Sequence, residues 1–345
     1  MAFDPIQEDC LRLTLSNIQR GGINPLIDPQ SVQRLVEQYQ ADPEQLIAND
    51  AERSFHLVAL ACGIIDYRVP FLTDPAEAES QATLAEQHLR EAIELDPGNW
   101  DARRMLAAME SSSNDAYVTY LLEHTSEVES TLPKENAEQA ASYEDGLALT
   151  LEARPYLRWL SALASRQLIA GQYSAALKTA RDCLAIDPYD AGDIRHTGVY
   201  ALAKLERPAQ ELDQLTASPL ETRRTDPWEL IARMSLAYRD FDYAVAGDCL
   251  RKLLHAYPHG AESLMYQAEF PDGVFSRVNV EPGSDDELVL ALSEATPLLQ
   301  EGAGTPDAAC FSTWVATHEL VRQAIQSQQK RPRGRGRAVR KNGGA

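Results

Sequence analysis

The sequence has no segment suited to crossing a membrane or to directing export. Its longest nearly apolar run, from Phe55 to Ile65, is interrupted by His56 and is much shorter than the roughly twenty residues of a membrane-spanning helix. A buried core helix is the better interpretation of this run. The N-terminal residues MAFDPIQEDC contain neither a basic nor an apolar stretch, so we expect no secretory signal and no membrane contact.

Paired cysteines are also absent from the sequence. The five cysteines lie far apart and form no CxxC pair: Cys10, Cys62, Cys183, Cys249 and Cys310. An odd number of scattered cysteines in a chain without an export signal is typical of a reducing compartment. We therefore expect a cytoplasmic protein in which several of these thiols act as small hydrophobic residues of the core.

Positive charge is scarce. Lysine and arginine number 32 against 52 acidic residues, and the formal net charge is −20. A body this acidic repels nucleic acid and anionic membranes. The hydrophobic share of 44% and the charged share of 24% indicate a globular chain, and 345 residues suffice for two ordinary domains or one elongated repeat array.

The sequence lacks the loops that nucleotide-binding and acyl-transfer enzymes use. It contains no GxxxxGK[ST] loop, no GxGxxG loop after a strand and no GxSxG turn. His255 and His259 are four residues apart, but Pro258 between them breaks the helix on which they would share a face. We therefore expect no enzymatic activity, no catalytic residues, no bound metal and no cofactor.

A helix–turn–helix repeat is the strongest positive signal. The segment Leu157 to Asp190 predicts two helices that flank Gly171, the second of which ends before Pro188. This is the thirty-four-residue layout of a tetratricopeptide repeat (TPR). Small residues at fixed positions let the two helix backbones approach closely. The matching positions are Leu160, Leu163, Ala164, Tyr173, Ala176 and Cys183.

Weaker copies of this pattern occur on both sides. Helices are predicted at Asp50–Tyr67, Leu84–Asn99, Trp100–Glu110, Asn114–Glu129, Ala191–Leu205 and Tyr243–His255, and others begin at Pro208 and Pro227. Gly198 takes a close-packing position, and Pro70–Ser80 forms an insert. The sequence thus predicts an all-α fold, namely a TPR-type α-solenoid in which antiparallel helix pairs form a right-handed superhelix.

The repeats suggest four regions. Residues 1–47 form an N-terminal helical cap, 48–268 the TPR-like repeats, 269–329 an irregular link with C-terminal helices, and 330–345 a disordered tail rich in arginine and glycine. Within the third region, Ser284 is a predicted N-cap before the helix Leu288–Gln300. A final helix is predicted at Asp307–Ser327.

Three stretches support a family resemblance. The residues Glu152-Ala153-Arg154-Pro155-Tyr156-Leu157-Arg158 lead into the best repeat, and Tyr257-Pro258-His259 and Gly283-Ser284-Asp285-Asp286-Glu287 follow later. In this order they resemble the suppressor-of-tumorigenicity family of tetratricopeptide proteins. The resemblance runs from about Leu84 to Trp314. It implies an all-helical repeat protein and no catalytic residues to transfer.

The first helices of the pairs predict a peptide-binding groove. In such arrays these helices line the concave face, where a partner segment binds. The predicted groove residues are Arg158, Ser161, Ser165, Leu168, Arg195, Val199, Leu202 and Arg233. The three arginines would form a ladder of guanidinium groups that binds carboxylates of the partner. Alternatively, they pair with neighbouring acids such as Glu152, Asp193 or Glu229 and only order the array.

The C-terminal tail differs from the body in charge. The sequence RPRGRGRAVRKNGG contains no acidic residue, and its arginines are Arg331, Arg333, Arg335, Arg337 and Arg340. Such a tail is suited to weak, salt-sensitive nucleic-acid contact, to folding back on the acidic body, or to self-association. We therefore expect a protein–protein interaction scaffold that binds a protein or peptide partner in the groove. The alternative is a nucleic-acid-associated adaptor that acts through the tail.

Overall fold

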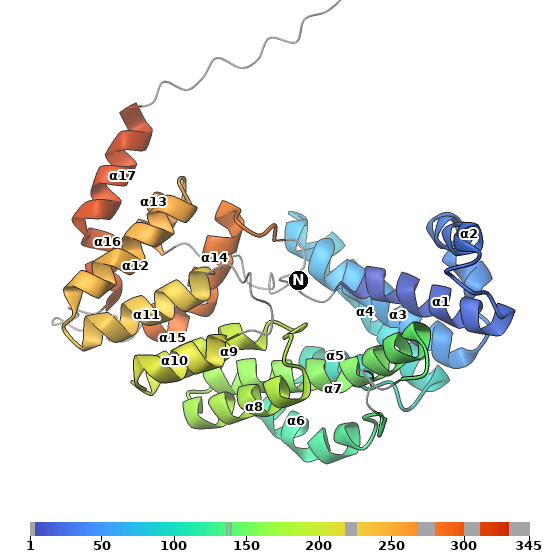
Figure 1. Ribbon diagram of the computed structural model, residues 1–345. Coiled ribbons are helices and arrows are strands. Elements are labelled where there is room, and N and C mark those ends of the chain that lie inside the picture. Colours follow the sequence, from blue (N-terminus) through green and yellow to red (C-terminus); the bar gives the residue numbers. More distant parts are fainter. Residues whose placement is uncertain are drawn as a thin grey trace, which may run out of the picture.

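The secondary structure consists of helices throughout the part of the chain that the structure describes. The computed structural model describes residues 4–135, 137, 140–217, 226–267, 280–299 and 311–330, and these residues contain no strand (Figure 1). None of the helices in these ranges combines the length and the apolar character that a membrane span requires. The prediction of an all-α fold is confirmed.

The N-terminal helices begin at aspartate caps. They are α1 (Pro5–Gly21), α2 (Pro29–Ala41) and the 3-10 helix η1 (Pro43–Leu46). The Asp4 carboxylate accepts hydrogen bonds from the N–H groups of Ile6 and Gln7 at 2.9 and 3.0 Å, which satisfies donors that the first turn of α1 leaves open. Asp28 accepts in the same way from Ser31 at the start of α2.

The next five helical elements follow the predicted pattern closely. They are α3 (Asp50–Tyr67), the 3-10 helix η2 (Val69–Phe71), α4 (Pro75–Leu95), α5 (Trp100–Glu110) and α6 (Asn114–Glu129). The predicted bounds of α3, α5 and α6 are confirmed. The predicted start of α4 at Leu84 is wrong, because Asp74 caps a helix that already begins at Pro75 and takes in part of the expected insert.

The best sequence repeat forms the pair α7 (Tyr143–Ile169) and α8 (Tyr173–Ile186). Gly171 lies in the turn with φ of 76°, a conformation that favours glycine. Helix α7 begins at Tyr143, directly after its N-cap Ser142 and well before Leu157, and it contains Pro155 in its interior. The predicted lead-in to the repeat is therefore part of the helix.

The C-terminal part of the chain contains shorter helices. They are α9 (Ile194–Lys204), α10 (Ala209–Thr216), α11 (Pro227–Arg239), α12 (Tyr243–Ala256), α13 (Ala261–Tyr266), α14 (Asp285–Glu294), α15 (Thr296–Leu299), α16 (Phe311–Thr317) and α17 (Glu319–Lys330). The two predicted C-terminal helices are each divided, the first near Ala295 and the second near His318. Most of the predicted irregular link, Cys310 and the arginines of the tail lie outside the described residues.

Consecutive helices pack against one another along the chain. The buried apolar residues form three clusters in chain order, between Leu57 and Leu106, between Tyr117 and Ile194, and between Leu168 and Val321. The predicted close approach at Gly198 is confirmed, since a Cβ atom there would lie 2.8 Å from Leu215 Cδ2 and 3.4 Å from Ala180 Cβ.

Helices from both ends of the chain cover the first helices of the later pairs. Helix α1 packs on α7, and α14 and α15 pack on α11 and α9 (Figure 1). The hydroxyl of Tyr200 on α9 donates a hydrogen bond of 2.8 Å to the carbonyl of Ala291 on α14. The indole N–H of Trp228 on α11 donates to Glu294 at 2.5 Å. The face that the sequence assigned to a partner therefore meets the chain's own helices.

Candidate binding site

The predicted groove residues do not form one exposed surface. Four of them are buried, namely Leu168, Arg195, Val199 and Leu202, and the other four, Arg158, Ser161, Ser165 and Arg233, are partly buried. At the four buried positions the side chain is covered by other parts of the chain, so a partner-binding role for these eight residues stays a prediction.

Arg158 joins three helices through two buried carboxylates. Its guanidinium binds both oxygens of Asp101 on α5, with Nε 2.7 Å from Oδ1, and its Nη1 lies 3.0 Å from Glu8 Oε2 on α1. Arg12 and Arg154 also bind Glu8, at 2.7 and 2.8 Å. This arginine holds α1 and α5 to α7 and is not available to a partner.

The two carboxylates are ionised because arginines surround them. Burial acts to raise the pKa of Glu8, but the charges of three arginines outweigh it and lower the pKa. Burial acts in the same direction on Asp101, and Arg158 in turn lowers its pKa. The same two carboxylates raise the pKa of Arg158 against the effect of its burial. Arg158 thus pairs with acids, as the alternative interpretation has it, but with Glu8 and Asp101 from distant helices and not with the neighbouring Glu152.

The apolar groove residues belong to the core. Leu168, Val199 and Leu202 lie in the same buried cluster as Leu290 and Leu298 of the C-terminal helices. Val199 and Leu202 lie on α9, on which α15 packs. Ser161 lies under the α8–α9 turn, where a Cβ atom on Gly192 would be only 3.0 Å from its hydroxyl oxygen.

Arg195 and Arg233 each bind groups of their own region, so no ladder forms. Arg195 lies 3.2 Å from Asp190 and donates to the carbonyls of Pro188 at 2.6 Å and Leu215 at 3.2 Å. Arg233 binds Glu229 at 2.8 Å and also Asp213. Because each guanidinium already has ordered acceptors, a continuous row of arginines open to ligand is absent from the described residues.

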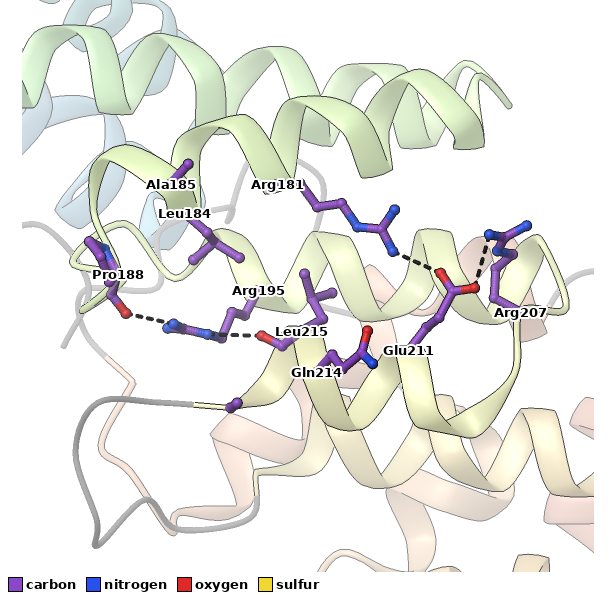
Figure 2. A pocket seen from close by; sticks show the side chains of 10 residues that line it. Arg181, Leu184, Ala185, Pro188, Arg195, Arg207, Glu211, Gln214 and Leu215 are labelled. Carbon is purple, nitrogen blue, oxygen red and sulfur yellow. Dashed lines mark hydrogen bonds and ion pairs between the residues drawn. The ribbon is translucent and has the colours of Figure 1, made fainter.

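A pocket of about 830 Å³ opens between α8 and α10 (Figure 2). Both are the second helices of successive pairs, so the pocket lies on other helices than the predicted groove. Its lining residues are Arg181, Leu184, Ala185, Pro188, Arg195, Arg207, Glu211, Gln214, Leu215 and Ala217. Arg195 is the one predicted site residue among them.

Two arginines meet on a single carboxylate at the rim of this pocket. Arg181 Nη2 lies 2.8 Å from one oxygen of Glu211, and Arg207 Nη2 lies 2.9 Å from the other oxygen (Figure 2). The side chains of Arg181 and Arg207 are 47% and 50% exposed. Their hydrogen bonds, that of Arg181 first, lower the pKa of Glu211. The Glu211 carboxylate is therefore ionised. It binds the guanidinium groups of Arg181 and Arg207, both of which are also exposed to solvent.

The pocket is locally basic in an acidic protein. Its lining contains three arginines and one glutamate, although the chain carries a net charge of −20. Leu215 and the partly buried Leu184 supply apolar surface beside the charged rim, and Gln214 supplies an exposed amide (Figure 2). Such a combination is suited to a carboxylate next to an apolar side chain.

Sequence reasoning missed Arg181 and Arg207 because it searched the first helices of the pairs. Arg181 lies on the outer face of α8, and Arg207 lies in the connection to α10. The only signal for them in the sequence is that one arginine precedes and the other follows the end of the best repeat at Asp190. Such a signal has no value without knowledge of where Glu211 lies.

Neither a metal site nor a reactive thiol is indicated among the residues that the structure describes. Within the described ranges, no group of three or more His, Cys, Asp and Glu side chains is placed to hold a metal ion. Cys10, Cys62, Cys183 and Cys249 are free thiols. Burial raises the pKa of Cys183 to about 12, so this thiol is protonated at neutral pH and unreactive.

Comparison with known proteins gives no match: no protein-family model, no curated protein and no solved structure is similar enough to this chain to be matched.

Proposed function

We propose that the protein is an interaction scaffold that binds an acidic segment of a partner protein in the pocket between α8 and α10. The observation that carries this proposal is the pair of exposed arginines, Arg181 and Arg207, that share the single carboxylate of Glu211 at the rim. An acidic partner is favoured because this basic pocket interrupts a surface of opposite charge.

The scaffold is proposed to be a TPR-type α-solenoid that resembles the suppressor-of-tumorigenicity family. Successive helix pairs and a core divided into three clusters in chain order support this architecture. It departs from a simple array because α1, α14 and α15 cover the first helices. We therefore place the partner site on the second helices α8 and α10, between which the pocket is open.

The internal carboxylate occupies the position that a ligand carboxylate takes. Ion pairs between exposed side chains contribute about 0–1 kcal/mol each, so an incoming carboxylate can replace Glu211 on either arginine. An arginine fork binds a carboxylate through two parallel hydrogen bonds, which adds geometric selectivity. The apolar surface of Leu184 and Leu215 then contacts a neighbouring side chain of the ligand.

A binding assay with defined peptides tests this proposal. A fluorescein-labelled peptide of alternating Glu and Leu residues is titrated into the full chain, with an alternating Gln and Leu peptide for comparison. Replacing both arginines, Arg181→Gln with Arg207→Gln, is expected to weaken binding of the acidic peptide by at least about tenfold. Glu211→Gln is expected to strengthen it roughly two- to fivefold, because the internal competitor is removed.

The control is an exposed arginine far from the pocket. Arg251 on α12 is 62% exposed and pairs with Asp248 at 2.7 Å. Arg251→Gln changes the net charge by the same amount per residue and is expected to leave affinity unchanged. The proposal is wrong if the double arginine variant binds the acidic peptide as tightly as this control, or if the uncharged peptide binds equally well.

A further inference from the structure

A row of aromatic side chains lies at the turn between α11 and α12. Phe241 and Tyr243 have ring centroids 6.4 Å apart, Tyr243 and Trp314 of α16 are 6.5 Å apart, and Trp314 and His318 are 4.7 Å apart. Phe241 is 78% exposed and Tyr243 is 49% exposed. We call these four residues the aromatic row. Trp314 and His318 are partly buried. Aromatic rings that reach the surface side by side are a feature of recognition surfaces.

The backbone at Phe241 is one that phenylalanine disfavours. Its φ is 59°, in the left-handed region. The N–H of Phe241 donates to the Tyr238 carbonyl at 3.1 Å, and the N–H of Asp242 donates to the Ala237 carbonyl at 2.8 Å. This pair of hydrogen bonds is the pattern by which helices end at a left-handed residue, usually glycine. The equivalent turn after α7 has the same two hydrogen bonds and carries Gly171.

Left-handed backbone at a bulky residue costs about 1–2 kcal/mol. Because the Phe241 ring is exposed, burial of the ring in the core does not offset this cost in free energy. A phenylalanine in a glycine position, with its ring toward solvent, therefore points to a role for the ring outside the fold.

Acidic side chains flank the row. Asp240 and Asp242 are exposed on either side of Phe241, and Asp242 also caps α12 by accepting from Val245. Alternating carboxylates and aromatic faces are suited to guanidinium groups, which stack on rings while they pair with carboxylates. The ligand that this surface fits is an arginine-rich segment.

The chain itself contains such a segment within reach. Helix α17 begins one residue after His318, ends at Lys330, and is about 18 Å long at 1.5 Å per residue. The fifteen residues 331–345 that follow contain five arginines. The ten residues from Arg331 to Arg340, taken as a glycine-containing chain, have a root-mean-square span of about 17 Å, close to the length of α17. A linker whose mean length matches the distance between the two sites gives the highest effective concentration of the tethered segment at its binding surface.

We propose that residues 331–345 dock on the aromatic row of the same molecule, with arginine side chains stacked over Phe241, Tyr243 and Trp314. Docking neutralises part of the acidic turn and holds the basic segment on the body. It thereby withholds this segment from other anionic ligands such as nucleic acid. This inference is independent of the α8–α10 pocket.

Trypsin cleavage of the full chain tests the docking. Trypsin cuts after arginine only where the segment is undocked, so the rate follows the undocked population. Phe241→Ala with Tyr243→Ala is expected to speed cleavage within residues 331–341 by at least about fivefold, measured by mass spectrometry. Phe71→Ala is the matched control, because this residue is 68% exposed on η2 and lies outside the row. Its cleavage rate is expected to equal that of the unaltered chain.

A second variant separates stacking from charge. Replacing the five arginines of the segment with lysine keeps both the charge and the trypsin sites, and it is expected to speed cleavage because lysine stacks poorly on rings. Unchanged rates in both variants overturn the proposal. Protection that grows with protein concentration overturns it as well, because it indicates docking between two copies.

Nucleic-acid binding gives an independent readout. A labelled single-stranded oligonucleotide is expected to bind the Phe241→Ala, Tyr243→Ala chain at least about threefold more tightly than the unaltered chain, since the basic segment is released. Equal affinities contradict the docking proposal. Oligonucleotide binding by the unaltered chain and by the double variant is expected to weaken steeply as the salt concentration rises.

Discussion

Replacing Arg158 with methionine removes the side chain that holds α1, α5 and α7 together. Its loss affects the two carboxylates unequally. Glu8 keeps Arg12 and Arg154 at 2.7 and 2.8 Å, whereas Asp101 keeps the longer ion pair with Arg104, at 3.6 Å, and the more distant charge of Arg12. Breaking a buried ion pair in this way costs about 3–5 kcal/mol, because a buried charge is left uncompensated. We expect Arg158→Met to lower the free energy of unfolding at pH 7 by that amount.

The pH dependence identifies the cause. In the unaltered chain the pKa of Asp101 is lowered, so its contribution to stability is present above the ordinary Asp range and is lost as the pH falls below it. Without Arg158, burial raises this pKa instead. The destabilisation is then full at pH 7 and is relieved as the pH falls toward 4. The difference in unfolding free energy between the two chains should therefore shrink with acidification.

Urea denaturation followed by circular dichroism at several pH values measures this difference. Asp101→Asn in the Arg158→Met background is expected to restore part of the stability, because it removes the uncompensated charge. Arg251→Met on the exposed face of α12 is the control and is expected to cost no more than about 1 kcal/mol. The reasoning is refuted if Arg158→Met costs no more than this control, or if its cost grows as the pH falls.

Two further predictions concern glycine packing and one partly buried carboxylate, Asp66. Gly260→Ala is expected to destabilise the protein by about 1–3 kcal/mol, because the added Cβ would clash with Leu288 and Tyr257. Gly247→Ala in α12 is expected to stabilise it by about 0.5–1 kcal/mol, because its Cβ meets no atom within 4 Å. Thermal melts of both variants measure the two effects. Burial raises the pKa of Asp66 to about 6, so its folded form favours the proton and stability is lost as the pH rises through that value. Asp66→Asn should therefore stabilise the protein by roughly 1–3 kcal/mol at pH 7.5 and flatten the decline in stability between about pH 4 and 6. An unchanged slope in urea titrations over that range contradicts this assignment.

Local signals in the sequence predicted many helix bounds. The starts of α3 and α6 follow capping residues, Asn49 and Ser113, whose side chains accept hydrogen bonds from the first turn. Small residues such as Gly198 correctly indicated close helix contacts, because only a short side chain fits where two backbones meet. These features depend on residues a few positions apart.

The candidate site depended on contacts that the sequence leaves open. The groove prediction treated the helix pairs as an open array, whereas α14 and α15 return to pack on α11 and α9. Arginine patterns alone did not separate Arg158, which is buried against Glu8, from Arg181, which remains at a pocket rim. Both are arginines on amphipathic helices, and only their surroundings distinguish them.

The sequence by itself determined that the described chain is helical, where many of its helices begin and end, and that the protein is strongly acidic. Capping, hydrophobic periodicity and composition act locally, so they can be interpreted without a structure. Only the tertiary structure decided which arginines are buried and which meet at the pocket. The Glu8–Arg158 and Arg181–Glu211 pairs are separated by 150 and 30 positions, and a charged residue binds whichever partner the packing of apolar faces brings near.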